Sequence, residues 1–268
     1  MTDMEKLPAK TGWLWVKEGL ALFRKQPAEV STLFLSYMFL MLALGILPII
    51  GQLLPLILVP VFAMSFMQAC RQIEEGKRVY PSLLLVGFRS PALRTLLVLG
   101  VLYLLAAFAA VGVSTLVDGG AFWKAMTGPG LDPKDIEGSN LRLAMIVAAL
   151  VYIPAAMAFW FAAPLVAWHK MSLGKALFYS FFAVRRAAKA FMVYGLAWLV
   201  IGVLLPATIS TIVALLFNNM TVIVFILLPL SIILTVVMYC SFYPTYTAVF
   251  GKPPRDDAPA PESNDSAR

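Results

Sequence analysis

The residues whose types could do chemistry are few in this chain and stand far apart. The single histidine, His169, lies between Trp168 and Lys170, and the two cysteines, Cys70 and Cys240, lie in or at the end of apolar stretches. A metal site needs several His, Cys or carboxylate ligands at close spacing, and the sequence offers no such group. We therefore expect His169 to be solvated at a membrane interface and the cysteines to be small buried hydrophobic residues.

The acidic residues offer no better basis for catalysis. Glu74 and Glu75 are adjacent, as are Asp256 and Asp257, and neighbouring carboxylates in a loop or tail are usually solvated. No G-x-S-x-G, H-E-x-x-H or phosphate-binding glycine-rich pattern occurs in the sequence. The six long apolar stretches defined below contain no Asp, Glu, Lys, Arg or His, the groups on which coupled ion transport depends. The sequence thus predicts a protein that is not an enzyme and uses no cofactor.

The composition indicates a chain that resides in a lipid bilayer. Apolar residues make up 61% of the chain and charged residues 13%, about half the share that is usual in soluble domains. The mean hydropathy is +0.85, too high for a chain that must cover itself with polar surface. The charges are concentrated between the apolar stretches, because a charge at the centre of a bilayer costs several kcal/mol.

Six stretches are long and apolar enough to cross a bilayer as helices. Residues 48–52 join the first two stretches and residues 218–219 the last two, and both links are short enough to be tight turns. We therefore expect an all-α fold, a polytopic bundle of six transmembrane helices in three hairpins at about residues 30–70, 95–168 and 190–250. The stretches are Val30–Ile50, Leu53–Cys70, Thr95–Val117, Leu143–Trp168, Ala190–Phe217 and Val222–Phe250.

The basic residues predict the side of the membrane on which each end of the chain lies. Eighteen of the 21 lysines and arginines fall before, between or after the hairpins, and three fall on the opposite side. Cytoplasmic loops carry such an excess, so we expect both termini in the cytoplasm. The same bias accounts for the net charge of +7 without nucleic acid, for which no binding pattern occurs. Residues 1–252 are expected to form one membrane domain, and the polar tail 253–268 to be disordered.

A segment rich in aromatic, aliphatic and basic residues precedes each hairpin, at residues 12–27, 82–91 and 172–189. The recurrence suggests three repeated units, with chance similarity in an apolar chain as the alternative. On a helical wheel, the first and third segments carry an apolar face opposite a basic one, which suits a helix lying in the membrane interface. These cations either contact anionic lipid or only anchor and orient the hairpins. The residues expected to face anionic lipid are Lys17, Arg24, Lys25, Arg89, Lys175, Arg185, Arg186 and Lys189.

Prolines occur in or near all three hairpins. A proline frees a backbone carbonyl and kinks a helix, and broken helices build binding sites in transporters. The prolines therefore either line a transport cavity or shape the packing of a compact bundle. At the end of the sixth stretch, Tyr239, Tyr243 and Tyr246 are expected to serve interface packing. The expected kink positions are Pro60, Pro154, Pro164, Pro206, Pro229 and Pro244.

Several short motifs resemble those of an uncharacterised family of proteobacterial inner-membrane proteins. The motifs are Gly12–Trp15, Gly19–Pro27, Leu47–Gly51, the Pro60 segment ending at Arg71, and Gly87–Arg89. This resemblance implies a location in the bacterial inner membrane and no defined activity. The layout also resembles the membrane portion of some glycerophosphodiester phosphodiesterases, but their catalytic domain is not found in this sequence, so no activity carries over.

Two functions are consistent with these observations. The leading hypothesis is a non-enzymatic scaffold, assembly or lipid-associated factor, because basic surface segments accompany spans without charges. The alternative is a permease or exporter of a neutral or amphipathic solute that uses proline-broken helices. A polar pocket beside Pro60, Pro164 or Pro206 would favour transport, and a solid apolar core would count against it. Membrane lipids are the expected partners, and assembly into a homo-oligomer or a membrane complex stays open.

Overall fold

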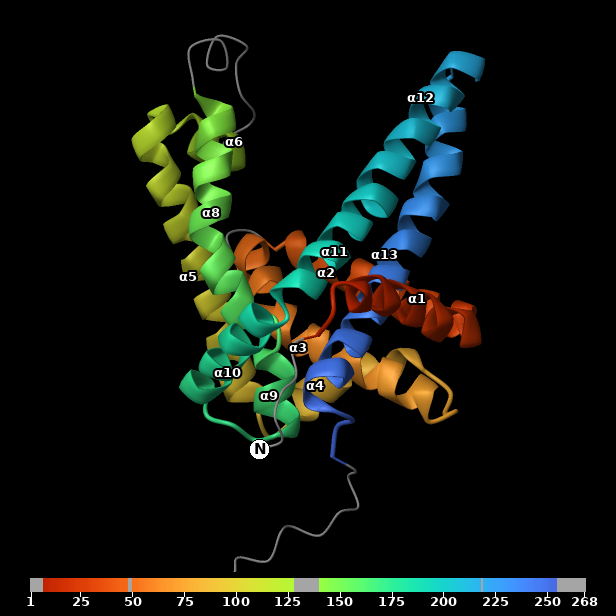
Figure 1. Ribbon diagram of the computed structural model, residues 1–268. Helices are drawn as coiled ribbons and strands as arrows, with labels where there is room; N and C mark the ends of the chain where they lie inside the picture. Colours follow the sequence, from red (N-terminus) through yellow and green to blue (C-terminus); the bar gives the residue numbers. More distant parts are fainter. Residues whose placement is uncertain (1–6, 48–49, 128–139, 218, 255–268) are drawn as a thin grey trace, which may run out of the picture.

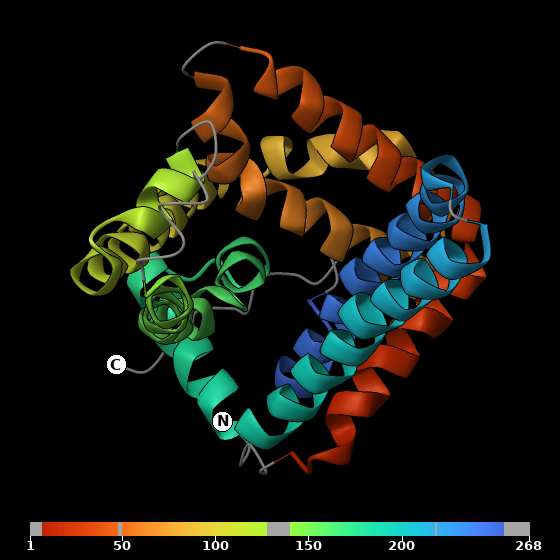
Figure 2. The same cartoon turned by 90° about the horizontal axis from the view of Figure 1, so that it is seen from above.

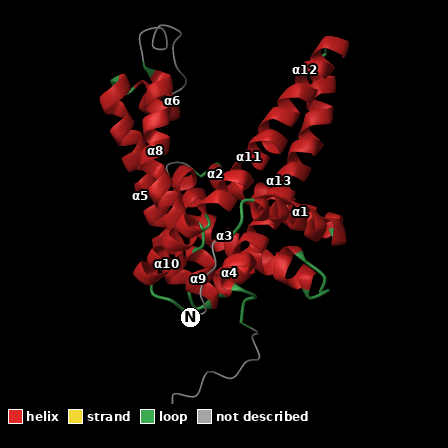
Figure 3. Cartoon of the chain, in the orientation of Figure 1, coloured by secondary structure: helices red, strands yellow, loops and turns green. Residues whose placement is uncertain are grey.

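The computed structural model describes residues 7–47, 50–127, 140–217 and 219–254. These residues are almost entirely helical, and no strand occurs in this part of the chain (Figure 3). Six helical segments are long and apolar enough to cross a membrane, which confirms the predicted all-α fold with six spans. The spans are Pro27–Gly45, Leu53–Glu74, Leu93–Asp118, Leu141–Trp168, Ala188–Phe217 and Met220–Phe250.

The elements follow the predicted alternation of surface segments and hairpins. α1 precedes the hairpin of α2 and α3, the short pair η1 and α4 precedes α5 to α9, and α10 precedes α11 to α13. The bounds are α1 Lys10–Lys25, α2 Pro27–Gly45, α3 Ile50–Glu74, η1 Pro81–Leu85, α4 Val86–Arg89, α5 Leu93–Asp118, α6 Ala121–Thr127, α8 Leu141–Phe159, α9 Ala162–Trp168, α10 Leu173–Arg186, α11 Ala188–Leu199, η2 Val200–Leu204, α12 Leu205–Phe217 and α13 Met220–Phe250.

The hairpins diverge from a common base. Figure 1 shows the α5–α8 pair and the α12–α13 pair rising as two arms, with α1 crossing near the lower part of α13. Seen from above in Figure 2, the helices surround α9. The last two spans contain 30 and 31 residues. A helix of that length measures about 45 Å, more than the thickness of about 30 Å of a bilayer core, so a span of this length fits only by tilting, by kinking or by extending beyond the core.

The amphipathic helix α1 is packed against protein along its apolar face. That face contacts α11 and α13. A Cβ added at Gly19 would come within 2.6 Å of the Ser241 Cα atom, so the two backbones are in direct contact there. The basic face, including Lys17, stays exposed. The buried residues of α1 are Gly12, Trp15, Val16, Gly19 and Leu22.

The segment before the second hairpin is not one amphipathic helix. It consists of the 3-10 turn η1 and the single helical turn α4. Pro81 begins η1, and Ser90, which precedes Pro91, is extended with φ −69° and ψ 136°. A residue before proline avoids the helical region, so the two prolines limit the helix from both sides.

Two of the six expected kink positions lie beside real interruptions. The fourth span breaks after Phe159 and resumes at Ala162. In a regular helix the ring of Pro164 would clash with the carbonyl of the residue four positions before it. The fifth span contains the π-helical turn η2 just before Pro206. The remaining prolines lie within helices that continue through them, namely Pro60, Pro154, Pro229 and Pro244.

The third surface segment is shorter than the sequence indicates. α10 ends at Arg186, and Ala187, with φ −92° and ψ 15°, separates it from α11. Lys189 therefore lies in the first turn of α11 and not on the amphipathic helix. The buried face of α10 consists of small residues, whereas Phe178 is 62% exposed. The buried residues of α10 are Ala176, Ser180, Ala183 and Val184.

Candidate functional site

A cavity of about 340 Å³ lies between α2, α3, α5, α8, α9 and α13. Its walls are mostly aromatic and aliphatic. Val59 and Trp160 line it and each keep 36% of their surface exposed, so the cavity opens to the surroundings. Pro164, which the sequence analysis named as a possible cavity residue, is part of the lining. Four tyrosines and a threonine bring hydroxyl groups to the walls, namely Tyr37, Tyr103, Tyr152, Tyr239 and Thr245.

Aromatic rings in the walls pack against one another. The ring centroids of Phe66 and Tyr239 lie 4.5 Å apart, and those of Tyr103 and Phe159 lie 4.2 Å apart. The Tyr103 hydroxyl donates a hydrogen bond of 3.0 Å to the Phe159 carbonyl oxygen, which joins α5 to the end of α8. Aromatic pairs of this kind stabilise a fold by more than the burial of their apolar surface alone would. The walls therefore form a surface suited to an apolar chain.

The break in the fourth span forms one wall of the cavity. The Ser180 hydroxyl accepts a hydrogen bond from the Phe161 N–H at 2.9 Å and donates one to the Met157 carbonyl at 2.8 Å. These two backbone groups would bond directly in a regular helix, so the hydroxyl from α10 is inserted between them. Trp160 donates from Nε1 to Thr245 Oγ1 at 3.3 Å, which ties the break to α13.

A second cavity, of about 270 Å³, lies between α3, α4 and α9. Its polar lining includes Gln68, Arg89 and Ser90, and Trp168 forms part of the wall. The Ser90 Oγ atom accepts the Ala92 N–H at 3.2 Å, which leaves the hydroxyl proton to donate. Among the residues that the structure describes, the lining contains a cation, an amide and a hydroxyl, and no carboxylate. This pocket is therefore suited to an anion.

Of the eight cations expected to face anionic lipid, only Arg89 lines one of the two cavities. All eight side chains are exposed. Lys17 lies with its Nζ atom 5.7 Å from the centre of the Trp13 ring, and Lys175 has a similar contact at 5.8 Å with Tyr179. The other seven are distributed over α1, α10 and α11, namely Lys17, Arg24, Lys25, Lys175, Arg185, Arg186 and Lys189.

The acidic pair at the end of α3 belongs to a polar network. Tyr243 donates to a Glu74 carboxylate oxygen at 2.8 Å, and Lys252 forms an ion pair with Glu74 at 2.9 Å. Arg71 donates to Glu75 at 3.1 Å. The hydrogen bond from Lys77, together with that from Arg71, lowers the pKa of the Glu75 carboxyl. Both residues nevertheless stay exposed, as expected of solvated carboxylates, and their partners are what the sequence did not indicate.

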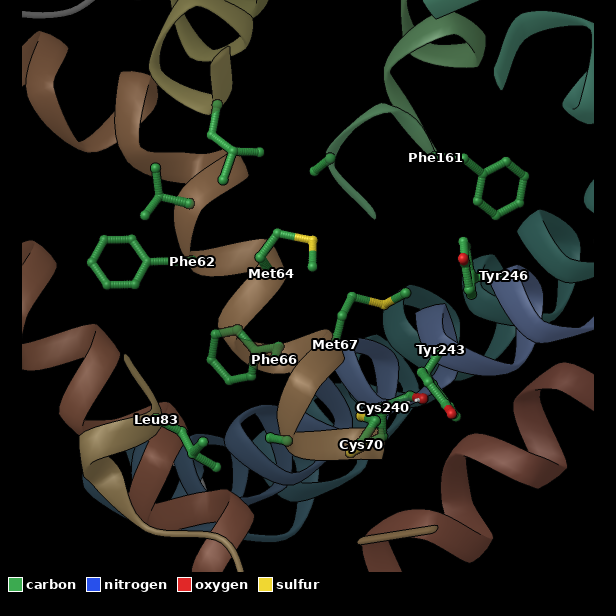
Figure 4. Close-up of a cluster of buried hydrophobic side chains, with 14 of the residues drawn as sticks. Phe62, Met64, Phe66, Met67, Cys70, Leu83, Phe161, Cys240, Tyr243 and Tyr246 are labelled. Carbon is green, nitrogen blue, oxygen red and sulfur yellow. Dashed lines mark hydrogen bonds between the residues drawn. The ribbon is translucent and has the colours of Figure 1, made fainter. Parts of the chain in front are cut away.

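His169 also has a buried partner. Its Nε2 atom lies 2.7 Å from the hydroxyl oxygen of Tyr246, a residue with no exposed surface. Partial burial lowers the pKa of the His169 imidazole, which favours the neutral ring. The sequence did not indicate this contact, and the half-buried side chain is only partly solvated. Cys70 and Cys240 are free and buried, as predicted, and Figure 4 shows them side by side below Tyr243.

Among the described residues, no three His, Cys, Asp or Glu side chains come together as a possible metal site. The expectation that the protein uses no cofactor stays a prediction.

The helical spans define the class as a polytopic integral membrane protein. The chain belongs to the same family as a probable inner membrane protein of Burkholderia thailandensis. The two are 40% identical over 252 residues, which cover 92% of this chain and 93% of the relative. The predicted resemblance to uncharacterised inner-membrane proteins is thus confirmed, whereas the likeness to glycerophosphodiester phosphodiesterases finds no support. No known family profile and no solved structure matches the chain.

Proposed function

We propose that this protein is a non-enzymatic, lipid-associated factor of the inner membrane that holds an amphipathic molecule in the aromatic cavity between its hairpins. The observation that carries the proposal is the cavity of about 340 Å³ with apolar walls and a few hydroxyl groups. Sites for small molecules have this character, because apolar walls supply affinity and a few polar groups fix orientation. Inside a bilayer, the most abundant molecules of matching chemistry are lipids.

If the lipid binds in this cavity, the amount of bound lipid must depend on the free volume of the cavity. Ala63 lines the cavity, so Ala63→Trp is expected to fill part of it and to lower the amount of co-purified lipid about tenfold, the effect of a steric cost of about 1.4 kcal/mol. The matched control is Ala109→Trp, which adds the same side chain at an exposed position of α5. Native mass spectrometry after purification in a mild detergent measures bound lipid. Equal lipid retention by the two variants would contradict the proposal.

The membrane orientation is part of the proposal. Eighteen of the 21 basic residues support cytoplasmic termini. In Figure 1, α4, α9 and α10 lie at the same end of the molecule as the last described residues. This arrangement is consistent with most of the basic residues lying on one side of the membrane. Green fluorescent protein fused after Lys252 is expected to fluoresce, and alkaline phosphatase fused there to be inactive. Alkaline phosphatase inserted between Thr127 and Asn140 is expected to be active. The reverse pattern would contradict this orientation.

A permease or exporter is the second candidate function. The observation that favours it is the break in the fourth span beside Pro164, because interrupted helices border the binding sites of many transporters. Protein reconstituted in vesicles distinguishes the two functions. Movement of a fluorescent lipid analogue across the membrane faster than in protein-free vesicles would favour transport. Binding of the analogue without its movement would favour the lipid-associated factor.

A further inference from the structure

The two cavities have walls on the same pair of helices, α3 and α9. On α3, Ala63 and Met67 line the aromatic cavity, and on α9 Ala163 and Pro164 do so. The basic pocket is lined by Met64 and Gln68 of α3 and by Ala167 and Trp168 of α9. On α9 the pocket residues lie four positions, or about one turn of 5.4 Å, further toward the carboxyl end. On α3 they follow cavity residues by a single position, so the pocket lies at nearly the same height and on the neighbouring side of that helix.

These carboxyl ends lie on the side that carries the basic residues. α3 is followed by Lys77 and Arg78, and α9 by Lys170. Arg89 enters the pocket from α4, which belongs to the same connecting segment. On α9 the basic pocket therefore lies nearer to this side of the molecule than the aromatic cavity does. Trp168, which lines the pocket, is a residue type enriched at the level of lipid headgroups.

Two methionines of α3 line the two cavities, one in each. Met67 lines the aromatic cavity and Met64 the basic pocket. The two are three positions apart, so they share one face of α3, and Figure 4 shows them together on the side away from the Phe62 ring. Methionine is unbranched and flexible, and its side chain adapts to the shape of a ligand. A site that joins the two cavities would depend on movement of these two side chains.

We infer that the two cavities form one binding site for a phosphate-bearing lipid, with its apolar chain in the aromatic cavity and its phosphate at Arg89. This inference rests on the proposed function and adds the class of the ligand. The Arg89 guanidinium provides charge-assisted hydrogen bonds to phosphate oxygens, and Gln68 and Ser90 provide further donors. The described part of the chain contributes no carboxylate to the pocket lining that would oppose the anion.

Three ligands separate the contributions of chain and phosphate. Dioleoyl phosphatidylglycerol has both, dioleoylglycerol has the same chains without phosphate, and glycerophosphoglycerol has the phosphate without chains. Native mass spectrometry of the delipidated full-length protein in detergent measures each affinity. We expect phosphatidylglycerol to bind about tenfold more tightly than dioleoylglycerol, as charge-assisted hydrogen bonds allow. We expect glycerophosphoglycerol at an equal concentration to leave phosphatidylglycerol bound.

Matched variants assign the preference to the pocket. Arg89→Gln is expected to lower the affinity for phosphatidylglycerol to that for dioleoylglycerol and to leave the latter unchanged. Arg94→Gln removes the same charge from an exposed residue outside both cavities and is expected to behave as the wild type. Ala63→Trp is expected to weaken the binding of both lipids.

The outcomes separate this inference from the proposed function. Equal affinity of the wild type for the two lipids, or an Arg89→Gln variant that keeps the wild-type preference, would overturn the inference and leave cavity binding in place. Displacement of phosphatidylglycerol by an equal concentration of glycerophosphoglycerol would assign the pocket to a soluble phosphate compound and overturn the joint site. Wild-type affinity of Ala63→Trp for dioleoylglycerol would overturn the proposed function itself.

Discussion

Replacing Gly100 with alanine is expected to lower the midpoint of thermal unfolding by about 2–12 °C. Gly100 lies where α5 crosses α3, and a Cβ at this position would collide with the backbone carbonyl of Ile57 and come within 2.9 Å of its Cα atom. Backbone atoms in a helix cannot move aside as a flexible side chain can. Overpacking of this kind costs about 1–3 kcal/mol, and each kcal/mol shifts the midpoint by about 2–4 °C in a chain of this size class.

Gly112 on the same helix supplies the control, because nothing lies within 4 Å of the Cβ that alanine would add there. Alanine is favoured over glycine in a helix by roughly 0.5–1 kcal/mol, so Gly112→Ala is expected to leave the midpoint unchanged or to raise it. The two substitutions are chemically identical and have opposite predicted signs. Fluorescence-detected size-exclusion chromatography after heating in detergent measures both. Equal midpoints for the two variants would show that α3 and α5 do not touch at Gly100.

The sequence predicted the spans well because hydropathy is a local property. The expected stretch Thr95–Val117 corresponds to the helix Leu93–Asp118, and the expected stretch Ala190–Phe217 to the span Ala188–Phe217. Each span is delimited by polar or charged residues that lie within a few positions of its ends. No knowledge of the tertiary contacts is needed to locate such a boundary.

The sequence could not predict the partners of the polar residues. Tyr243 and Tyr246 were expected to serve interface packing, but their hydroxyl groups contact Glu74 and His169 across 169 and 77 positions of the chain. Tyr239, from the same series, lines the aromatic cavity. Three residues at helical spacing share a face of α13, but the pattern does not reveal which helices pack against that face.

The apolar face of α1 illustrates a second limit. A helical wheel separates the apolar residues Trp15 and Val16 from the basic residue Lys17, and the structure has the same separation. An apolar face is equally compatible with lipid and with a neighbouring helix, since both exclude water. The burial of Trp15 and Val16, together with the close approach of Gly19 to α13, shows that protein covers this face. Likewise, proline content alone did not distinguish Pro164, beside a real break, from Pro154, within a continuous helix.

Replacing Ser180 with alanine is expected to destabilise the protein by about 1–3 kcal/mol, although it removes a single oxygen atom. Ser180 has no exposed surface, and its hydroxyl is hydrogen-bonded to both the Phe161 N–H and the Met157 carbonyl. Without it, these buried backbone groups lose their partner, and each unsatisfied group is costly in an apolar surrounding. The alternative is that α8 and α9 join into a regular helix, which Pro164 opposes because its ring clashes with the carbonyl of Trp160.

Ser36→Ala is the matched control, because the Ser36 hydroxyl donates to the Thr32 carbonyl within its own helix and is not needed to satisfy it. Its effect is expected to stay within about 0.5 kcal/mol. Thermal unfolding in detergent compares the two variants, and native mass spectrometry compares their bound lipid. The break forms a wall of the aromatic cavity, so Ser180→Ala is expected to lose lipid where Ser36→Ala keeps it. If Ser180→Ala matched Ser36→Ala in both measurements, the Ser180 hydroxyl would not be what maintains the break, and packing around Pro164 alone would have to do so.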